Sequence, residues 1–224
     1  MKKTTLAICM ALVLSACSKD ESQTEASTAS ATKETEAKTV ESAMPPAATK
    51  PHAAASASDK EALIAEAKGA VMALGGSLKK ELQGAMMSGG PVAALDVCVE
   101  KAPAITKQIS EEKNLEIGRV SLKNRNSGNA ANEWQTAVLN DFETRKAGGE
   151  DAGKLAYAET VDIDGKKEFR FMKAIPTGNL CLTCHGDIVP ENVVAKLKEH
   201  YPEDKATGFK EGDLRGAFYV VKPL

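Results

Sequence analysis

The sequence Cys181-Leu182-Thr183-Cys184-His185 combines two thiols and an imidazole at a fixed spacing. In a C-x-x-C-H sequence the two thiols add to the vinyl groups of haem as thioethers, and the adjacent histidine binds the iron from one face. These residues therefore predict one covalently bound c-type haem. Cys181 and Cys184 are its predicted attachment points, and His185 is its predicted iron ligand.

Zinc binding and thiol redox chemistry are two competing interpretations of the same residues. A closed zinc site needs four ligands, and the nearby sequence has no second C-x-x-C, so Cys98 and His200 would have to be recruited from a distance. A thioredoxin-like pair belongs at the start of a helix in a βαβ unit. The sequence around Cys181 has no such pattern, and haem attachment is the interpretation that we favour.

The first residues of the chain have the pattern of an export signal. Two lysines precede an apolar run over residues 6–14, which ends in Leu-Ser-Ala-Cys at Cys17. This run is too short to span a bilayer, which takes roughly 20 residues, and residues 1–16 are therefore predicted to be a cleaved signal peptide. Leu-Ser-Ala-Cys resembles the lipobox of bacterial lipoproteins, so Cys17 is expected to carry a lipid anchor. Ser18 after this cysteine favours the outer membrane, with the protein on its periplasmic side.

Composition divides the rest of the chain into two parts. Residues 17–58 are mostly Ala, Thr, Ser, Glu and Lys and contain no aromatic residue, so they are predicted to form a disordered tether. A coil of about 40 residues has an r.m.s. span on the order of 35 Å. Residues 59–224 are predicted to form one domain. The chain is 42% hydrophobic with a formal charge of −2, so it lacks the basic excess typical of nucleic-acid binding.

The hydrophobic periodicity of the domain changes from helical to strand-like along the chain. The predicted helices are residues 59–74, 77–87, 92–110, 130–146 and 191–200, and the predicted strands are residues 117–122, 155–161, 167–174 and 215–221. Breaks are expected at Gly75-Gly76 and at residues 88–91, and a kink or break at Pro103. Residues 162–165 have the sequence of a hairpin turn. The sum predicts an α+β domain, with long helices flanking an antiparallel sheet of about four strands.

The five cysteines leave one residue without an assigned role. Cys9 leaves with the predicted signal peptide, Cys17 is expected to be lipidated, and Cys181 and Cys184 are expected to be bonded to haem. Cys98 therefore has no disulfide partner within the chain. It is either a buried structural thiol on the apolar face of a helix or a ligand of the haem iron.

Other residues compete with Cys98 for the second axial position. These are Met172 on the strand before the motif, His200 after it, and Met86 or Met87. Met172 falls on the opposite face of its strand from the neighbouring phenylalanines, and His200 lies at a helix end. Spacing alone ranks Cys98, Met172 and His200 close together.

Several segments of the domain resemble a family of single-haem c-type proteins with a PAS-like fold, often described only as a domain of unknown function, which occurs alone or as the sensor part of kinases. The segments are Leu-Asp-Val-Cys at 95–98, Arg-Val-Ser-Leu-Lys-Asn-Arg-Asn at 119–126, Cys-Leu-Thr-Cys-His-Gly at 181–186, Tyr-Pro-Glu-Asp-Lys-Ala-Thr-Gly-Phe at 201–209 and Gly-Asp-Leu-Arg-Gly-Ala at 212–217. The similarity covers nearly all of residues 60–224. It implies an iron held by His185 and Cys98. One departure is Ser127, where a proline is common in the family.

Thiolate ligation would favour Fe(III) over Fe(II) and give a low midpoint potential. A thiolate can be protonated or displaced on reduction, which would open a site for CO or NO. Arg119 and Arg125 either pair with the haem propionates or are solvated charges. We therefore expect a redox or gas-responsive sensor that acts on an unidentified protein partner, with a tethered low-potential electron carrier as the alternative. Catalysis ranks third, because the sequence has no recognisable acid and base pair.

Overall fold

The computed structural model describes residues 57–224, and the predicted signal peptide, Cys17 and nearly all of the predicted tether lie outside these residues. None of the helices within residues 57–224 is both long and apolar enough to cross a membrane. The elements follow one another as α1 (Ala57–Asp96), the π-helical turn η1 (Val97–Lys101), α2 (Ala102–Lys113), β1 (Glu116–Val120), the 3-10 turn η2 (Ser127–Asn129), α3 (Glu133–Ala147), β2 (Ala156–Ile163), β3 (Lys166–Pro176), α4 (Asn179–His185), α5 (Glu191–His200) and β4 (Leu214–Pro223).

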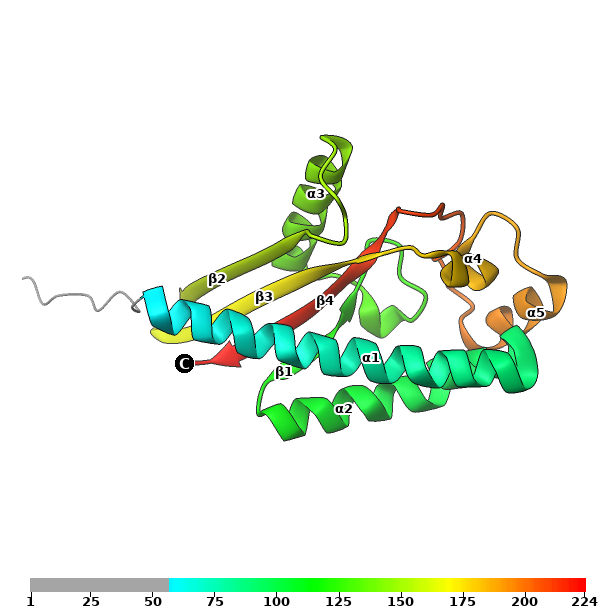
Figure 1. The fold of residues 1–224 in the computed structure, drawn as a ribbon, viewed down its shortest axis with the longest axis horizontal. Helices are drawn as coiled ribbons and strands as arrows, with labels where there is room; N and C mark the ends of the chain where they lie inside the picture. The colour runs from blue at the N-terminus through cyan, green and yellow to red at the C-terminus, as the bar shows by residue number, and fades with distance from the viewer. Residues whose placement is uncertain (1–56) are drawn as a thin grey trace, which may run out of the picture. The chain divides into compact units, whose positions relative to one another are not determined.

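The four strands form one antiparallel sheet in the order β1-β4-β3-β2 (Figure 1). β2 and β3 form the predicted hairpin, in which Ile163 pairs with Lys166 across Asp164 and Gly165. The φ angles of these two turn residues, 53° and 80°, are both positive, as a type I′ turn requires. The predicted α+β class is therefore confirmed, with the N-terminal helices packed on a four-stranded antiparallel sheet.

Helices cover both faces of this sheet (Figure 1). On one face α1 and α2 bury a cluster that includes Leu74 of α1 and Phe171 of β3. On the other face α3 packs Leu139 and Phe142 against Met172 of β3. Phe171 and Met172 face opposite ways because successive side chains of a strand alternate. The two clusters hold the sheet between its helices. Residues at the ends of β1, β3 and β4 lie outside most of this packing and line the candidate site.

The predicted interruption at Gly75-Gly76 is wrong, because α1 passes through both residues. Gly75 serves helix packing instead. A Cβ atom at this position would lie 3.1 Å from Cζ of Phe218 in β4, so the absent side chain lets α1 approach the sheet. The predicted break at residues 88–91 is confirmed at Gly90, whose φ and ψ of 73° and −165° are not helical.

The backbone irregularity that the sequence places at Pro103 lies in η1 instead. Pro103 follows η1 directly in the first positions of α2, and because the helical backbone continues through η1, its missing N–H leaves the preceding turn without one donor. The wider π-helical turn of η1 contains Cys98. Such turns occur frequently at functional sites.

A third buried cluster joins α5 to the end of α1. Leu95 packs there with Val193 and Leu197, and Cys184 of α4 and Tyr201 lie against them. This cluster holds the C-x-x-C-H helix beside the turn that carries Cys98, although the two segments are far apart in the sequence.

Candidate functional site

One cavity is lined by the predicted attachment and iron-ligand residues, namely Cys98, Cys181, Cys184 and His185. Its volume is about 610 Å³, which is within the range of small-molecule and cofactor sites. Apolar side chains form much of the remaining wall, and those from α1, β3 and β4 include Leu78, Leu82, Met86, Leu95, Ile175 and Phe218. The fold therefore brings the C-x-x-C-H motif and the remote cysteine to the same apolar space.

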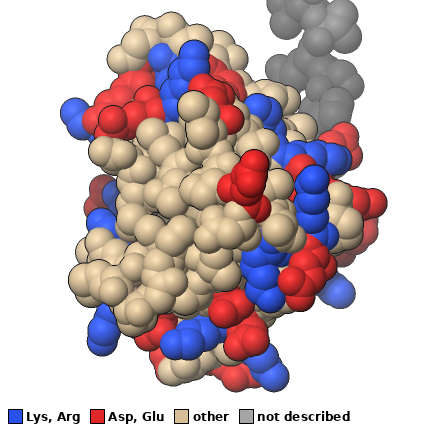
Figure 2. Space-filling view, turned by 90° about the vertical axis from the view of Figure 1, so that its right-hand side faces the viewer, with Lys and Arg blue, Asp and Glu red and all other residues tan. Residues whose placement is uncertain are grey.

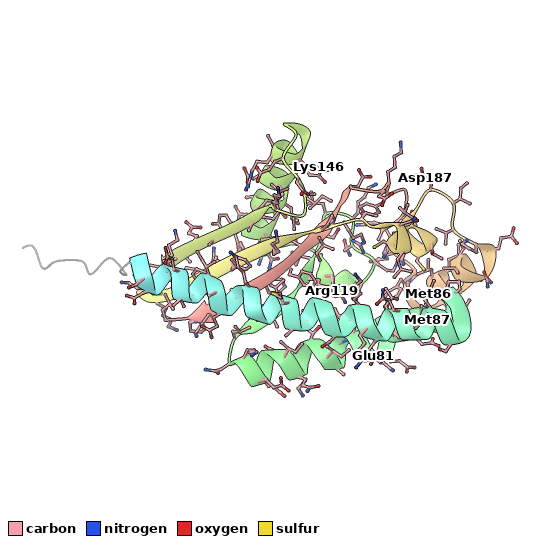
Figure 3. The ribbon with its side chains drawn as sticks, in the orientation of Figure 1. Glu81, Met86, Met87, Arg119, Lys146 and Asp187 are labelled. Carbon is pink, nitrogen blue, oxygen red and sulfur yellow. The ribbon has the colours of Figure 1, made fainter. Side chains whose placement is uncertain are left out.

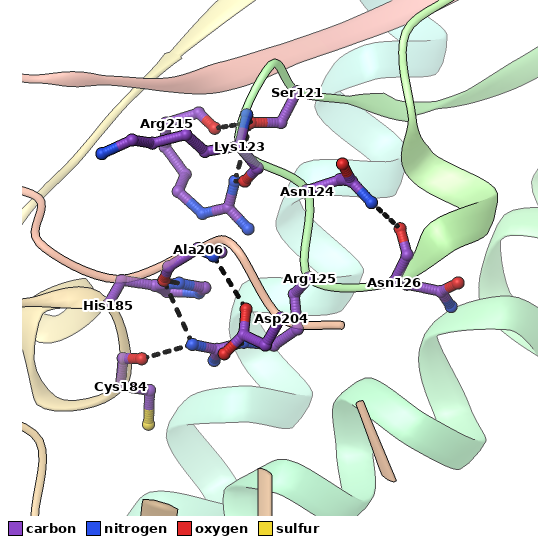
Figure 4. Close-up of polar contacts among 10 residues, drawn as sticks. All are labelled: Ser121, Lys123, Asn124, Arg125, Asn126, Cys184, His185, Asp204, Ala206 and Arg215. Atoms are coloured by element: carbon purple, nitrogen blue, oxygen red, sulfur yellow. Dashed lines mark hydrogen bonds and ion pairs between the residues drawn. The ribbon is translucent and has the colours of Figure 1, made fainter. Parts of the chain in front are cut away.

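His185 lies at the C-terminal end of α4, and a hydrogen bond fixes its protonation state. Its Nδ1 is 2.7 Å from the Ala206 carbonyl oxygen (Figure 4). Because a carbonyl can only accept, Nδ1 carries the proton. Burial, with the nearby Arg215 and Arg125, lowers the pKa of His185 well below its usual value. The ring is therefore neutral, and its Nε2 has a free lone pair of the kind that binds iron.

Cys98 lies on η1, and its thiol is held in a mixed electrostatic environment. Burial raises the pKa of the Cys98 thiol, while Arg119, Arg125 and Arg215 act in the opposite direction. A metal cation would favour the thiolate strongly. The surroundings of Cys98 thus suit a sulfur that is neutral without a metal and anionic with one.

Three arginines converge on the cavity. Arg119 of β1, Arg125 of the following loop and Arg215 of β4 line it, and all three also line a second cavity of about 530 Å³ that shares Cys98 and His185 with the first. Burial and repulsion from the other two arginines lower the pKa of Arg215 to about 10. Like charges gathered at low exposure are stabilised by bound anionic groups. The site is therefore suited to a ligand that carries carboxylates.

Arg215 reaches the cavity because of a β-bulge. Ile175 pairs with Gly216 and Pro176 pairs with Leu214, so Arg215 is the extra residue on β4. A bulge redirects the side chain of the extra residue, and Nη1 of Arg215 donates to the Ser121 hydroxyl at 3.1 Å. Sequence reasoning placed Arg215 at the start of a predicted strand and within a resembling segment but gave it no role in the site, since a one-residue change of register has no local signature.

The structure gives Arg119 and Arg125 different environments. Nε of Arg125 donates to the Asp204 carboxylate at 3.1 Å, and its Nη2 donates to the carbonyls of Cys184 and Ala206 (Figure 4). Arg119 makes no hydrogen bond or ion pair with any residue in 57–224, and burial lowers the pKa of its guanidinium. Arg119 is thus the more available of the two cations.

The other predicted axial candidates lie in less suitable places. Met172 is fully buried in the cluster beneath α3, and His200 lines neither cavity. Met86 and Met87 are neighbours near the end of α1 (Figure 3), but only Met86 lines the first cavity, whereas Met87 is 85% exposed. Cys98 and Met86 are therefore the candidates that share a cavity with His185.

The side chains of residues 57–224 do not assemble a zinc site. Within this part of the chain, no three side chains of His, Cys, Asp or Glu gather closely enough to hold a metal ion. Structural zinc takes four protein ligands, whereas haem iron takes only two from the protein because the porphyrin supplies the rest. The ligand geometry fits haem better than zinc.

The fold and the site define a class of α+β domain in which a C-x-x-C-H helix closes a largely apolar cavity rimmed by arginines. The sequence model of the Tll0287-like family matches residues 16–223, and the chain belongs to this family. The structure is similar to the crystal structure of the cyanobacterial haem protein Tll0287, with 25% sequence identity and a TM-score of 0.52. The match covers 69% of this chain and 93% of that chain. No curated protein matches the chain at a significant level.

Proposed function

We propose that this chain is an exported, lipid-anchored protein that binds one c-type haem and acts as a redox or gas-responsive sensor on the periplasmic side of a bacterial outer membrane. Cys181 and Cys184 would form the thioether bonds, and His185 and Cys98 would be the axial ligands. The observation that carries the proposal is the neutral His185 imidazole, which has a free Nε2 lone pair and lines a cavity that Cys98 also lines. Membership of the Tll0287-like family, together with the similarity to a solved haem protein, supports the cofactor.

The cation arrangement supports the orientation of the bound haem. Haem carries its two propionates on the edge opposite to the vinyl groups, so attachment at Cys181 and Cys184 would direct the propionates away from α4. The second cavity, of about 530 Å³, is lined by Arg119 but by neither Cys181 nor Cys184. We therefore assign Arg119 as the propionate partner, since a half-buried arginine that makes no hydrogen bond or ion pair with any residue in 57–224 favours a carboxylate. The assignment predicts that Arg119→Gln reduces haem incorporation.

The sensor role is supported by the way His185 is connected to the protein. When bound, haem supplies one-electron redox chemistry and, with a labile sixth ligand, a binding position for NO or CO. The Ala206 carbonyl that accepts from His185 also accepts from Arg125. Arg125 in turn contacts Asp204 in the segment 201–209. A displacement of His185 would thus be transmitted to Arg125 in the loop after β1 and to Asp204 in the segment 201–209.

Optical and EPR spectroscopy of the oxidised and reduced protein tests the ligand assignment. Cys98→Ser should lose the thiolate signature of the oxidised wild type, because a hydroxyl is a far poorer iron ligand than a thiolate. Met86→Leu is the matched control, since it removes the other cavity sulfur outside the C-x-x-C-H motif. An unchanged spectrum for Cys98→Ser would show that the ligand is a different residue. Absence of haem from the mature wild type, by mass spectrometry, would refute the whole proposal.

A membrane-tethered electron carrier is the second candidate, and an exposed apolar rim favours it. Leu180, next to Cys181, is 38% exposed, and Ile188, just after α4, is 89% exposed. On the side of the molecule where α4 and α5 lie, uncharged residues cover much of the middle of the surface and most charged ones lie around it (Figure 2). Such a surface suits brief contact with a redox partner. Six-coordinate iron in both oxidation states would support the carrier, whereas loss of the thiolate on reduction with tight NO binding would support the sensor.

The location has its own test. Mass spectrometry of the mature chain should find a lipid on Cys17, and fractionation should recover the protein with the outer membrane. Cys17→Ser should release it in soluble form while its haem spectrum stays the same. Recovery of the wild type in the cytoplasm would contradict both the export and the lipid anchor.

A further inference from the structure

We propose that Arg125 is a positioning residue for His185 and raises the redox potential of the site through the Ala206 carbonyl. This inference rests on the proposed haem ligation by His185. It replaces the expectation that Arg125 pairs with a propionate, and it gives the arginine a role in setting the response of the sensor.

The hydrogen bonds of Arg125 surround the axial histidine. Its Nη2 donates to the Cys184 carbonyl at 2.6 Å and to the Ala206 carbonyl at 3.1 Å, and the same Ala206 oxygen accepts from His185 Nδ1 at 2.7 Å (Figure 4). The Phe209 N–H donates to the His185 carbonyl at 2.9 Å. Arg125 therefore joins the last turn of α4 to the segment that holds the histidine ring.

This group of contacts is largely removed from solvent. The side chains of Arg125 and Asp204 are 8% and 13% exposed, so their charges are poorly screened. Asp204 Oδ2 accepts from Nε of Arg125 at 3.1 Å, and Asp204 Oδ1 accepts from the Ala206 N–H at 2.8 Å. The pair thus acts on both the carbonyl and the N–H of Ala206.

The sign of the effect follows from the shared carbonyl. A cation that donates to the Ala206 oxygen withdraws electron density, so this oxygen accepts less strongly from His185 Nδ1–H. The imidazole then has less anionic character and stabilises Fe(III) less. The positive charge of Arg125 also favours the state that has gained an electron. Both effects raise the potential, and Asp204 opposes them.

Arg125 and Asp204 consequently have opposite predicted effects although they form a single ion pair. Arg125→Gln should lower the midpoint potential, and Asp204→Asn should raise it. A merely structural role predicts that both variants loosen the same segment and shift the potential in the same direction. The pair of substitutions therefore separates an electronic role from a structural one.

The test is a spectroelectrochemical titration of the full-length, haem-loaded protein, in which one electron from dithionite reduces the iron. We expect Arg125→Gln to lower the ratio of reduced to oxidised protein at a fixed potential by about tenfold, or about 59 mV for a one-electron couple. Asp204→Asn should raise the ratio by a similar factor. Arg125→Lys keeps the positive charge but lacks the planar guanidinium with its several N–H donors, so it should lower the ratio of reduced to oxidised protein by less. Arg170→Gln is the matched control, because Arg170 is ion-paired to Glu168 and 15% exposed but lines neither haem-site cavity.

Each outcome decides the inference. Shifts of the same sign in Arg125→Gln and Asp204→Asn, or shifts no larger than that of Arg170→Gln, would overturn it. A wild-type potential for Arg125→Lys would overturn the carbonyl route. If Arg125→Gln fails to fold, Asp204→Asn and Arg125→Lys still decide the sign. A wild type without covalent haem would instead refute the proposed function, which distinguishes the two failures.

Discussion

Gly216 lies where β4 passes over the end of β1, directly after the bulged Arg215. Its φ of 151° belongs to the region that favours glycine, and a Cβ atom there would lie 2.2 Å from the Val120 carbonyl oxygen. Val120 is itself held in the sheet by its pairing with Ala217, so the oxygen cannot move aside cheaply. Gly216→Ala should therefore destabilise the fold and displace Arg215 from the site.

The magnitude follows from two contributions. A side chain in a backbone conformation of this kind costs about 1–3 kcal/mol, and forcing an atom into an immobile contact costs about another 1–3 kcal/mol. The expected loss is about 2–6 kcal/mol, a large part of the 5–15 kcal/mol typical of a domain. With a urea dependence of about 2 kcal/mol per molar, the unfolding midpoint should fall by about 1–3 M.

Gly165→Ala is the control for this experiment. Gly165 also has a positive φ, 80°, but a Cβ atom there would have no neighbour within 4 Å. This variant should lose only the conformational contribution of about 1–3 kcal/mol. Urea unfolding followed by circular dichroism compares the two variants. If both lose the same free energy of unfolding, the contact with Val120 has no cost, and the close approach of β4 to β1 does not explain the glycine.

Three further predictions concern α3, the sheet and the cofactor. Asn132→Ala removes the acceptor of the Gln135 N–H at the start of α3, so urea unfolding should show a loss of about 1 kcal/mol. Burial and the Glu116 carboxylate raise the pKa of Tyr219 to about 12. Because the phenol of the unfolded chain titrates at about pH 10, the free energy of unfolding should fall as the pH rises from there through 12. Urea unfolding at pH 9 and at pH 11.5 measures this difference, and equal free energies of unfolding would contradict the prediction. Haem-free protein should melt at a lower temperature than haem-loaded protein, since its cavity loses packing contacts; equal melting temperatures would contradict this.

Local patterns in the sequence predicted much of the fold. The Asp164-Gly165 turn and the alternation of Phe171 and Met172 on β3 depend on neighbouring residues alone, and both are found as expected. The break at Gly90 also follows from local backbone preference. The break predicted at Gly75 was wrong because this glycine serves a tertiary contact. It makes room for Phe218, which lies near the other end of the chain.

The sequence by itself predicts the chemistry of attachment, because the thiols of Cys181 and Cys184 and the imidazole of His185 lie at the C-x-x-C-H spacing, which local chain geometry fixes. It also marked Cys98 as the cysteine without a partner. Only the tertiary structure decided that Cys98 shares a cavity with His185, that a bulge points Arg215 at it, and that Arg125 contacts the histidine's carbonyl partner. These relations depend on packing and strand register between distant segments, and no local pattern encodes them.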